Sequence, residues 1–163
     1  MTTKRPRFAL VLVARLRAHE EIDPAKVEEL VDEFRRSGVF LDPIWVARGT
    51  DVILNGHHRV AAARRLGATR VPAWVVDYDD RDVSLDRWQP GPALSKQEVV
   101  ARARQGKLFP PKTTRHRIAL PTPPRPTPIA RLLPRPRAQR RGSKPSRPRP
   151  RSRSRAGPAS GSE

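Results

Sequence analysis

The sequence of 163 residues contains no cysteine, which excludes disulfide bonds, zinc–thiolate sites and a thiol nucleophile. Aromatic residues are scarce, with three tryptophans, four phenylalanines and one tyrosine. No apolar run approaches the roughly 18–20 residues that a membrane-spanning helix needs. The short run Phe8–Val13 is followed by Arg15 and Arg17 without a cleavage site, which argues against a signal peptide. These absences predict a cytoplasmic protein with no membrane partner.

Acidic residues are too few to balance the basic ones, and the imbalance is concentrated at one end of the chain. Residues 119–163 hold 12 of the 34 lysines and arginines and 11 of the 19 prolines, but Glu163 is their single acid. This quarter of the chain therefore carries +11 of the net charge of +18. Such a composition lacks the apolar surface that would offset the entropy cost of ordering.

These numbers predict one domain over residues 1–118 and a disordered, Pro/Arg-rich tail over residues 119–163. Three interpretations of the tail are open. It could be a solvated basic segment, a non-specific nucleic-acid binder, or a degenerate or out-of-frame terminus.

Residues 1–118 alternate between strand-like and helix-like patterns. Apolar and β-branched runs predict strands at Phe8–Val13, Ile44–Ala47, Val52–Leu54 and Val71–Val76. Apolar stripes and capping residues predict helices from Pro24 to Gly38, from about His58 to Leu66, and from Ser95 to near Gly106. We therefore expect an α/β (α+β) fold with a mixed sheet and about three helices.

The stretch Asn55–Arg59 lies where a predicted strand ends and a helix begins. A helix start presents unpaired backbone N–H groups and the positive end of the helix dipole, both suited to an anion. Gly56 lets the backbone approach a ligand because it has no Cβ, and Arg59, His57 and His58 add side-chain donors. The pattern predicts a phosphate site. A plain strand–turn–helix with polar residues facing water is the alternative that these residues alone leave open.

Two further segments carry groups suited to phosphoryl chemistry. Glu20 precedes the first helix and could serve as a general base, or it could, like Glu21, favour the helix N-terminus electrostatically. A basic segment near the domain's end supplies cations and hydroxyl donors for phosphate or carboxylate, or it is an exposed linker. Its residues are Lys112, Thr113, Thr114, Arg115 and His116.

Other residue patterns give weaker indications. Trp88 is either a wall of the site or a core aromatic residue. The four histidines include no pair at i, i+4 spacing, so no metal site is predicted.

The same motifs carry a family resemblance. Residues 53–67, ILNGHHRVAAARRLG, resemble the signature of the ParB/sulfiredoxin superfamily, whose members hold nucleotide phosphates with a Gly-x-x-Arg turn. The chain lacks the cysteine that sulfiredoxins carry in this turn. It also lacks the Gly-Glu-Arg-Arg turn and the helix-turn-helix of chromosome-partitioning ParB proteins. It is more similar to the free L-serine kinases of the superfamily, over about residues 8–120. Leu16–Glu21, Asn55–Arg59 and Gly106–His116 carry this similarity.

The resemblance implies transfer of a phosphoryl group from magnesium-bound ADP or ATP to the hydroxyl of free L-serine or a similar small molecule. It implies that Glu20 is the catalytic base, that residues 55–59 bind the nucleotide phosphates, and that Trp88 and residues 112–116 bind substrate or phosphate. The family turn begins with Asp, whereas this chain has Asn55. The lost charge leaves open a non-catalytic ParB-like module for nucleotide sensing or DNA association, whose tail binds nucleic acid.

Overall fold

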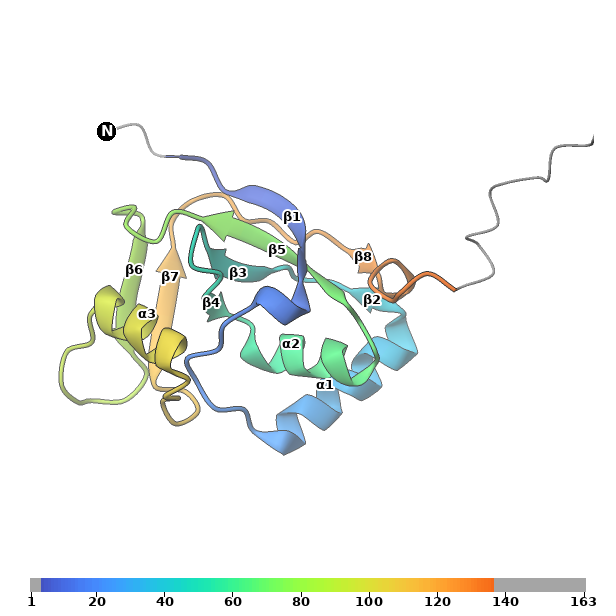
Figure 1. The fold of residues 1–163 in the computed structure, drawn as a ribbon, viewed down its shortest axis with the longest axis horizontal. Helices are drawn as coiled ribbons and strands as arrows, with labels where there is room; N and C mark the ends of the chain where they lie inside the picture. Colours follow the sequence, from blue (N-terminus) through green and yellow to red (C-terminus); the bar gives the residue numbers. More distant parts are fainter. Residues whose placement is uncertain (1–3, 137–163) are drawn as a thin grey trace, which may run out of the picture.

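The computed structural model describes residues 4–136, and a mixed sheet lies at the centre of this part of the chain (Figure 1). Its strand order is β1-β5-β3-β4. The strands are β1 (Arg7–Leu12), β3 (Ile44–Ala47), β4 (Ile53–Asn55) and β5 (Arg70–Val76). β5 pairs antiparallel with β1 and parallel with β3, and β3 forms an antiparallel hairpin with β4. The mixed sheet that the sequence predicts is thereby confirmed.

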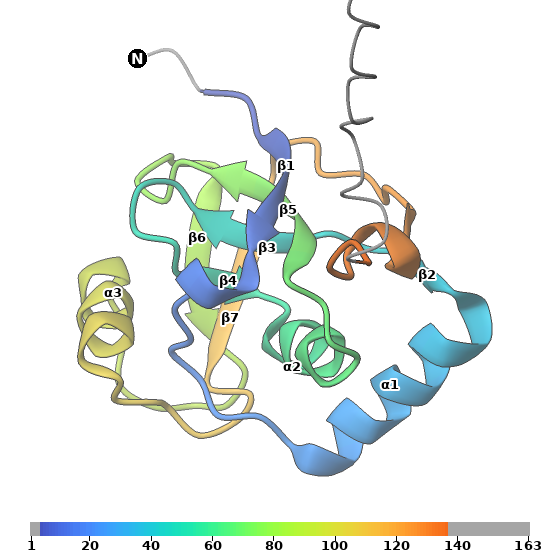
Figure 2. The same cartoon turned by 45° about the vertical axis from the view of Figure 1, so that its right-hand side comes forward.

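Two helices, α1 (Pro24–Ser37) and α2 (His57–Arg65), contact each other and pack on the same face of the sheet (Figures 1 and 2). The Asp23 carboxylate accepts the N–H of Ala25 at 3.0 Å and caps α1, while Gly38 ends it with a φ of 69°. Val27, Val31 and Phe34 on α1 are buried, as their spacing predicts. No helix within residues 4–136 combines the length and the apolar character that a membrane crossing requires.

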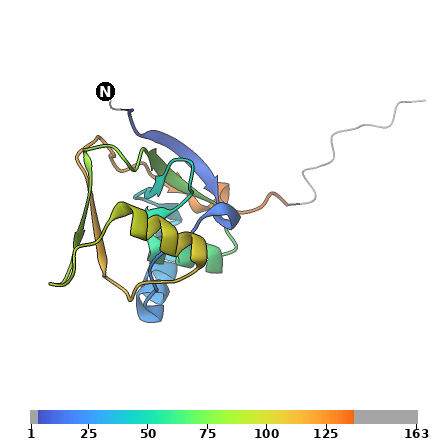
Figure 3. The same ribbon diagram turned by 60° about the vertical axis from the view of Figure 1, so that its left-hand side comes forward.

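A second, smaller layer is built from α3 (Lys96–Gln105) and a two-stranded antiparallel ribbon (Figure 3). The ribbon consists of β6 (Val83–Arg87) and β7 (Thr114–Ile118). The Ser95 hydroxyl caps α3 by accepting the N–H of Glu98 at 3.0 Å, as predicted. The two strands were not predicted, because charged residues occupy their outward positions and weaken the apolar pattern.

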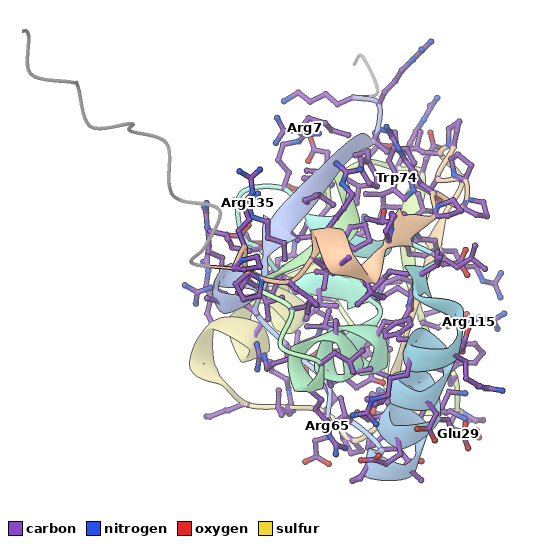
Figure 4. The ribbon with its side chains drawn as sticks, turned by 90° about the vertical axis from the view of Figure 1, so that its right-hand side faces the viewer. Arg7, Glu29, Arg65, Trp74, Arg115 and Arg135 are labelled. Carbon is purple, nitrogen blue, oxygen red and sulfur yellow. The ribbon has the colours of Figure 1, made fainter. Side chains whose placement is uncertain are left out.

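Residues 119–136 differ from the prediction that a disordered tail begins at residue 119. They run beside β1 and β5, where the Trp74 indole N–H donates to the Pro123 carbonyl at 3.0 Å (Figure 4). β8 (Thr127–Pro128) then pairs with β2 (Val39–Phe40), and a 3-10 turn, Ile129–Arg131, leads to Leu132. The Leu132 side chain is fully buried in the core beneath α1 and α2.

Backbone bonding explains why this proline-rich stretch is ordered. Its carbonyl and N–H groups bond to the domain at several points, including the N–H of Thr69 to the Leu132 carbonyl at 2.9 Å. The burial of Leu132 and these backbone hydrogen bonds therefore offset the entropy cost of ordering a segment whose composition is typical of disorder. We place the domain boundary after Leu132. The predicted disorder of residues 137–163 lies outside the described residues.

Candidate functional site

A cavity of about 760 Å³ opens between the start of α1, the start of α2 and the turn before β7. This volume lies in the range typical of small-molecule sites. Nine of the predicted site residues line it: Glu20, Asn55, Gly56, His57, His58, Arg59, Trp88, Lys112 and Thr114. The fold therefore brings the three sequence motifs together at one place. Asp23, Lys26 and Leu30 of the α1 region also line the cavity and were not predicted.

The turn between β4 and α2 has a backbone that only glycine accommodates. Gly56 has a φ of 112°, and a Cβ at this position would stand 2.9 Å from Cβ of Ile44. The Val60 N–H donates to the Gly56 carbonyl at 2.9 Å and opens the helical ladder. The N–H groups of residues 57–59 precede that ladder, at the positive end of the α2 dipole and on the cavity wall. This arrangement is suited to an anionic ligand.

Arg59 is held against the turn by backbone carbonyls. Its Nη1 donates to the carbonyl of Asp42 and, at 3.1 Å, to that of Pro43. A Cβ on Gly56 would stand 3.2 Å from Nη2, which places this nitrogen directly beside the turn. Burial lowers the pKa of Arg59 from its ordinary value, and the Asp42 carboxylate opposes this. The guanidinium is thus fixed in orientation, and Arg59 lines the cavity.

His57 and His58 require a correction, because both were predicted to act as ring donors. Nε2 of His57 accepts the backbone N–H of His19 at 3.2 Å, and Nε2 of His58 accepts that of Asp23 at 2.9 Å. Burial lowers the pKa of both rings, that of His57 well below 6.5. Neutral rings that accept at Nε2 carry their hydrogen on Nδ1. The two histidines therefore tie α2 to residues 19–23, and only Nδ1 remains as a donor.

Glu20 is joined to the turn before β7 by three hydrogen bonds. Its Oε1 accepts the N–H of Lys112, and its Oε2 accepts the N–H and the hydroxyl of Thr114 at 3.2 and 2.7 Å. A carboxylate has room for about four donors, so one acceptor position remains on Oε1. Because Glu20 lines the cavity, this position is available to a ligand hydroxyl.

The turn at residues 110–113 places Lys112 on the cavity wall. Lys112 has a φ of 57°, a left-handed conformation that is uncommon for residues other than glycine. The Thr113 hydroxyl donates to the Pro110 carbonyl at 2.7 Å and closes the turn. Thr113 therefore shapes the turn and, contrary to the prediction, does not line the cavity.

Arg115 and His116 also differ from their predicted roles as direct ligands. The Arg115 guanidinium, labelled in Figure 4, lies 4.5 Å from the ring centre of Trp88, whose own side chain lines the cavity and is 52% exposed. His116 is buried, and its Nε2 lies 2.7 Å from the Tyr78 hydroxyl. Neither residue lines the cavity. The cause is strand β7, along which successive side chains point to opposite faces and each step moves farther from the turn.

Three histidines form a cluster at the cavity: His19 and His116 are buried, and the half-buried His57 lines the cavity. The ring centres of His57 and His116 lie 4.6 and 5.7 Å from that of His19. Burial lowers the pKa of His19 to about 4 and that of His116 to about 3, so all three rings are neutral near pH 7. His19 was missed as a site residue, although it lies in Leu16–Glu21, one of the segments that carry the family resemblance.

We expect acid to unfold this protein at a higher pH than the titration of carboxylates alone would. A buried histidine with a lowered pKa is neutral when folded, whereas the unfolded ring binds a proton below about pH 6.5. Stability is therefore fully present above pH 6.5 and falls as the pH drops toward 4, by up to about 1.4 kcal/mol per pH unit for each histidine. Urea midpoints measured between pH 7 and pH 5 check this, and a constant midpoint would contradict it.

The comparisons with known proteins concern the fold and the family resemblance. The model of the ParB N-terminal domain family matches residues 8–86, which run from β1 into β6 and include the Gly56 turn. Residues 8–86 are thus similar to the ParB N-terminal domain family. The superfamily resemblance of the sequence is thereby confirmed, and the site combines residues inside this match with a turn beyond its end.

Two curated proteins are similar to this chain. The ADP-dependent L-serine kinase of Thermococcus kodakarensis is 31% identical over 110 residues, which cover 65% of this chain and 46% of that protein. The ATP-dependent L-serine kinase of Staphylothermus marinus is 41% identical over 85 residues, covering 50% of this chain and 34% of that protein. The chain spans less than half the length of these relatives.

A solved structure shares the fold. A mutant of a free serine kinase in complex with ADP superposes with a TM-score of 0.72 at 18% identity. The match covers 80% of this chain and 96% of that chain.

Proposed function

We propose that this protein is a small-molecule kinase that transfers a phosphoryl group from ADP or ATP to the hydroxyl of free L-serine or a similar molecule. The observation that carries the proposal is the shared cavity. A carboxylate with an open acceptor position, the start of α2 and Lys112 all line it. Phosphoryl transfer needs a nucleophile next to a base and positive groups around the phosphates, and the cavity supplies both. The similarity to two L-serine kinases supports the acceptor.

In the proposed reaction the serine hydroxyl lies against Oε1 of Glu20. Its oxygen bonds to the terminal phosphorus of the nucleotide, the bond from that phosphorus to the bridging oxygen breaks, and the hydroxyl proton passes to Glu20. The products are O-phosphoserine and AMP, or ADP when ATP is the donor. The N–H groups at the start of α2, with Arg59 and Lys112, stabilise the charge on the transferred group.

Magnesium is compatible with the cavity as an ion bound by the nucleotide. Within residues 4–136 no three His, Asp or Glu side chains are grouped so as to hold a metal ion. Mg²⁺ in kinases is bound largely by phosphates and water with one or two protein oxygens, and Asn55 and Asp23 on the cavity wall offer such oxygens. The ion would neutralise charge on the phosphates. Because Asn55 is neutral, we expect the protein's own share of Mg²⁺ binding to be weak.

Lys112 allows its backbone and its ammonium group to be tested separately. Lys112→Gly suits the left-handed φ of 57° and should keep the turn, whereas Lys112→Ala keeps the strain, about 1 kcal/mol. Both variants lose the ammonium group, so we expect kcat/KM to fall at least about tenfold in each, equivalent to about 1.4 kcal/mol. Lys112→Arg should retain most activity. Steady-state kinetics and thermal melts measure the two effects; wild-type kinetics in Lys112→Gly would exclude the ammonium group as a ligand.

The direct test of the function is turnover by the full chain. Purified protein is incubated with L-serine, Mg²⁺ and either ADP or ATP, and ³¹P NMR follows O-phosphoserine and the nucleotide products. We expect O-phosphoserine in stoichiometric amount with AMP or ADP. Nucleotide hydrolysis without O-phosphoserine, or no reaction with either donor, would reject the proposal.

A second candidate function is a non-catalytic, DNA-associated ParB-like module. Asn55 in place of the family's Asp and the charge of +11 on residues 119–163 favour it. Its test compares DNA binding by the full chain with that of a chain ending at residue 136, which retains the buried Leu132. This candidate predicts salt-sensitive DNA binding that the shorter chain loses, together with no serine phosphorylation by either.

A further inference from the structure

We propose that His19 is a positioning residue for Glu20, acting through the Thr114 hydroxyl; this inference rests on the proposed kinase function. A continuous chain of short contacts joins the three side chains. Nε2 of His19 lies 2.9 Å from the Thr114 hydroxyl, which lies 2.7 Å from Oε2 of Glu20. His19 is fully buried and does not line the cavity, so it does not touch a ligand there.

The direction of each hydrogen bond follows from the number of hydrogens available. The Thr114 hydroxyl has one hydrogen, and an ionised carboxylate can only accept. If the hydroxyl donated to His19, two oxygen atoms bearing lone pairs would face each other at 2.7 Å. The hydroxyl therefore donates to Glu20, and Nε2 of His19 carries a hydrogen that it donates to Thr114. His19 and His57 thus hold opposite tautomers, because His57 accepts at Nε2.

The consequence is a carboxylate with a fixed rotamer. The hydroxyl and N–H of Thr114 occupy Oε2, which directs the open acceptor position to Oε1. If His19 did not donate to it, the Thr114 hydroxyl could rotate and Oε2 would lose one of its donors. A base held in one orientation gives a higher reaction rate than one that rotates, because misplacement by about 1 Å can lower the rate about a hundredfold.

The backbone of His19 makes two further hydrogen bonds, one to the start of α2 and one to the segment before the Lys112 turn. Its N–H donates to His57 at the start of α2, and its carbonyl accepts the N–H of Phe109 at 2.8 Å, just before the Lys112 turn. One buried residue of the first motif therefore contacts both of the other motifs that meet at the cavity. These backbone bonds persist in side-chain variants, so substitutions of the ring leave them in place and remove its contacts with Thr114, His57 and His116.

The kinetic experiment compares variants along the chain of contacts. His19→Leu removes the ring donor, Thr114→Val removes the hydroxyl, and His19→Gln restores an N–H near the position of Nε2. Tyr78→Phe is the matched control, because it removes another buried hydroxyl contact, to His116, without touching Glu20. We expect kcat to fall at least about tenfold in His19→Leu and Thr114→Val, with the KM for nucleotide within about twofold of wild type. His19→Gln should recover part of kcat, and Tyr78→Phe should lower the melting temperature alone.

Two further measurements decide the interpretation. The double variant His19→Leu/Thr114→Val should be no slower than either single variant, since both act through one contact. Long-range ¹H–¹⁵N NMR on the wild-type chain should find the hydrogen of His19 on Nε2; a hydrogen on Nδ1 alone would overturn the proposal whatever the activity. Unchanged kcat in a folded His19→Leu, with the wild type active, would overturn this proposal but leave the kinase function standing. Absence of O-phosphoserine with the wild type would reject the function itself and, with it, the inference.

Discussion

Replacing Glu20 by Gln is expected to lower serine phosphorylation by about a thousandfold, within the range usual for loss of a general base. The amide cannot take the hydroxyl proton, and its NH₂ group would face either the N–H of Lys112 or the donors of Thr114. The nucleotide phosphates are assigned to α2, Arg59 and Lys112, so the Kd for ADP should change by less than about threefold (0.7 kcal/mol). Single-turnover kinetics and calorimetric titration with ADP measure the two quantities.

Glu21→Gln is the control for this experiment. Glu21 is adjacent and exposed, does not line the cavity, and contributes only its N–H to the Phe109 carbonyl among the contacts described for residues 4–136. We expect wild-type kinetics from it. A Glu20→Gln variant that turns over at the wild-type rate would exclude Glu20 as the base. The Glu20 carboxylate of the wild type would then serve only to hold the turn before β7 in place.

Replacing Gly56 by Ala is expected to abolish nucleotide binding and to destabilise the fold. A Cβ would clash with Ile44 and force a φ of 112° on an L-residue. Strain of this kind costs about 1–3 kcal/mol, and the overlap adds about as much. The start of α2 must shift to relieve it, which moves the N–H groups of residues 57–59. The affinity for ADP should fall more than about tenfold at temperatures where the variant is folded.

Gly67→Ala separates the clash from the backbone strain. Gly67 also has a positive φ, of 84°, but nothing lies within 4 Å of a Cβ there. This variant should lose about 1–2 kcal/mol of stability and bind ADP normally. Circular dichroism melts and calorimetric titration of both variants provide the data. Equal ADP affinity in Gly56→Ala and wild type would show that the turn does not hold the phosphates.

The parts of the fold set by local chemistry could be predicted from the sequence. The caps Asp23 and Ser95 and the terminating Gly38 act within a few residues of their own position, and each helix begins or ends where they indicate. Order in residues 119–136 could not be predicted, because it depends on Leu132 reaching a core formed by distant residues. Composition indicates how much apolar surface a segment can bury within itself. It does not indicate whether the core formed by the rest of the chain has room for one of its side chains.

The candidate site could likewise be predicted from the sequence only in part. The strand–glycine–helix pattern at Gly56 indicates an anion site from the residues themselves, whereas the meeting of Glu20 with Lys112 came from the family resemblance. The direction of the histidine bonds and the contact of His19 with Thr114, 95 positions away, required the structure. Arg115 and His116 were assigned as ligands with Lys112, Thr113 and Thr114 because all five belong to one motif of the family resemblance. Had β7 been predicted, its alternation would have separated them.

Titration of the ¹⁵N-labelled chain with ADP and Mg²⁺ tests most directly whether the start of α2 holds the phosphates. The largest amide shifts should fall on His57, His58 and Arg59 and on the turn at residues 112–114, and Gly56→Ala should abolish them. Shifts confined to other surfaces, or none at ADP concentrations that saturate binding, would contradict the phosphate site and the reaction built on it.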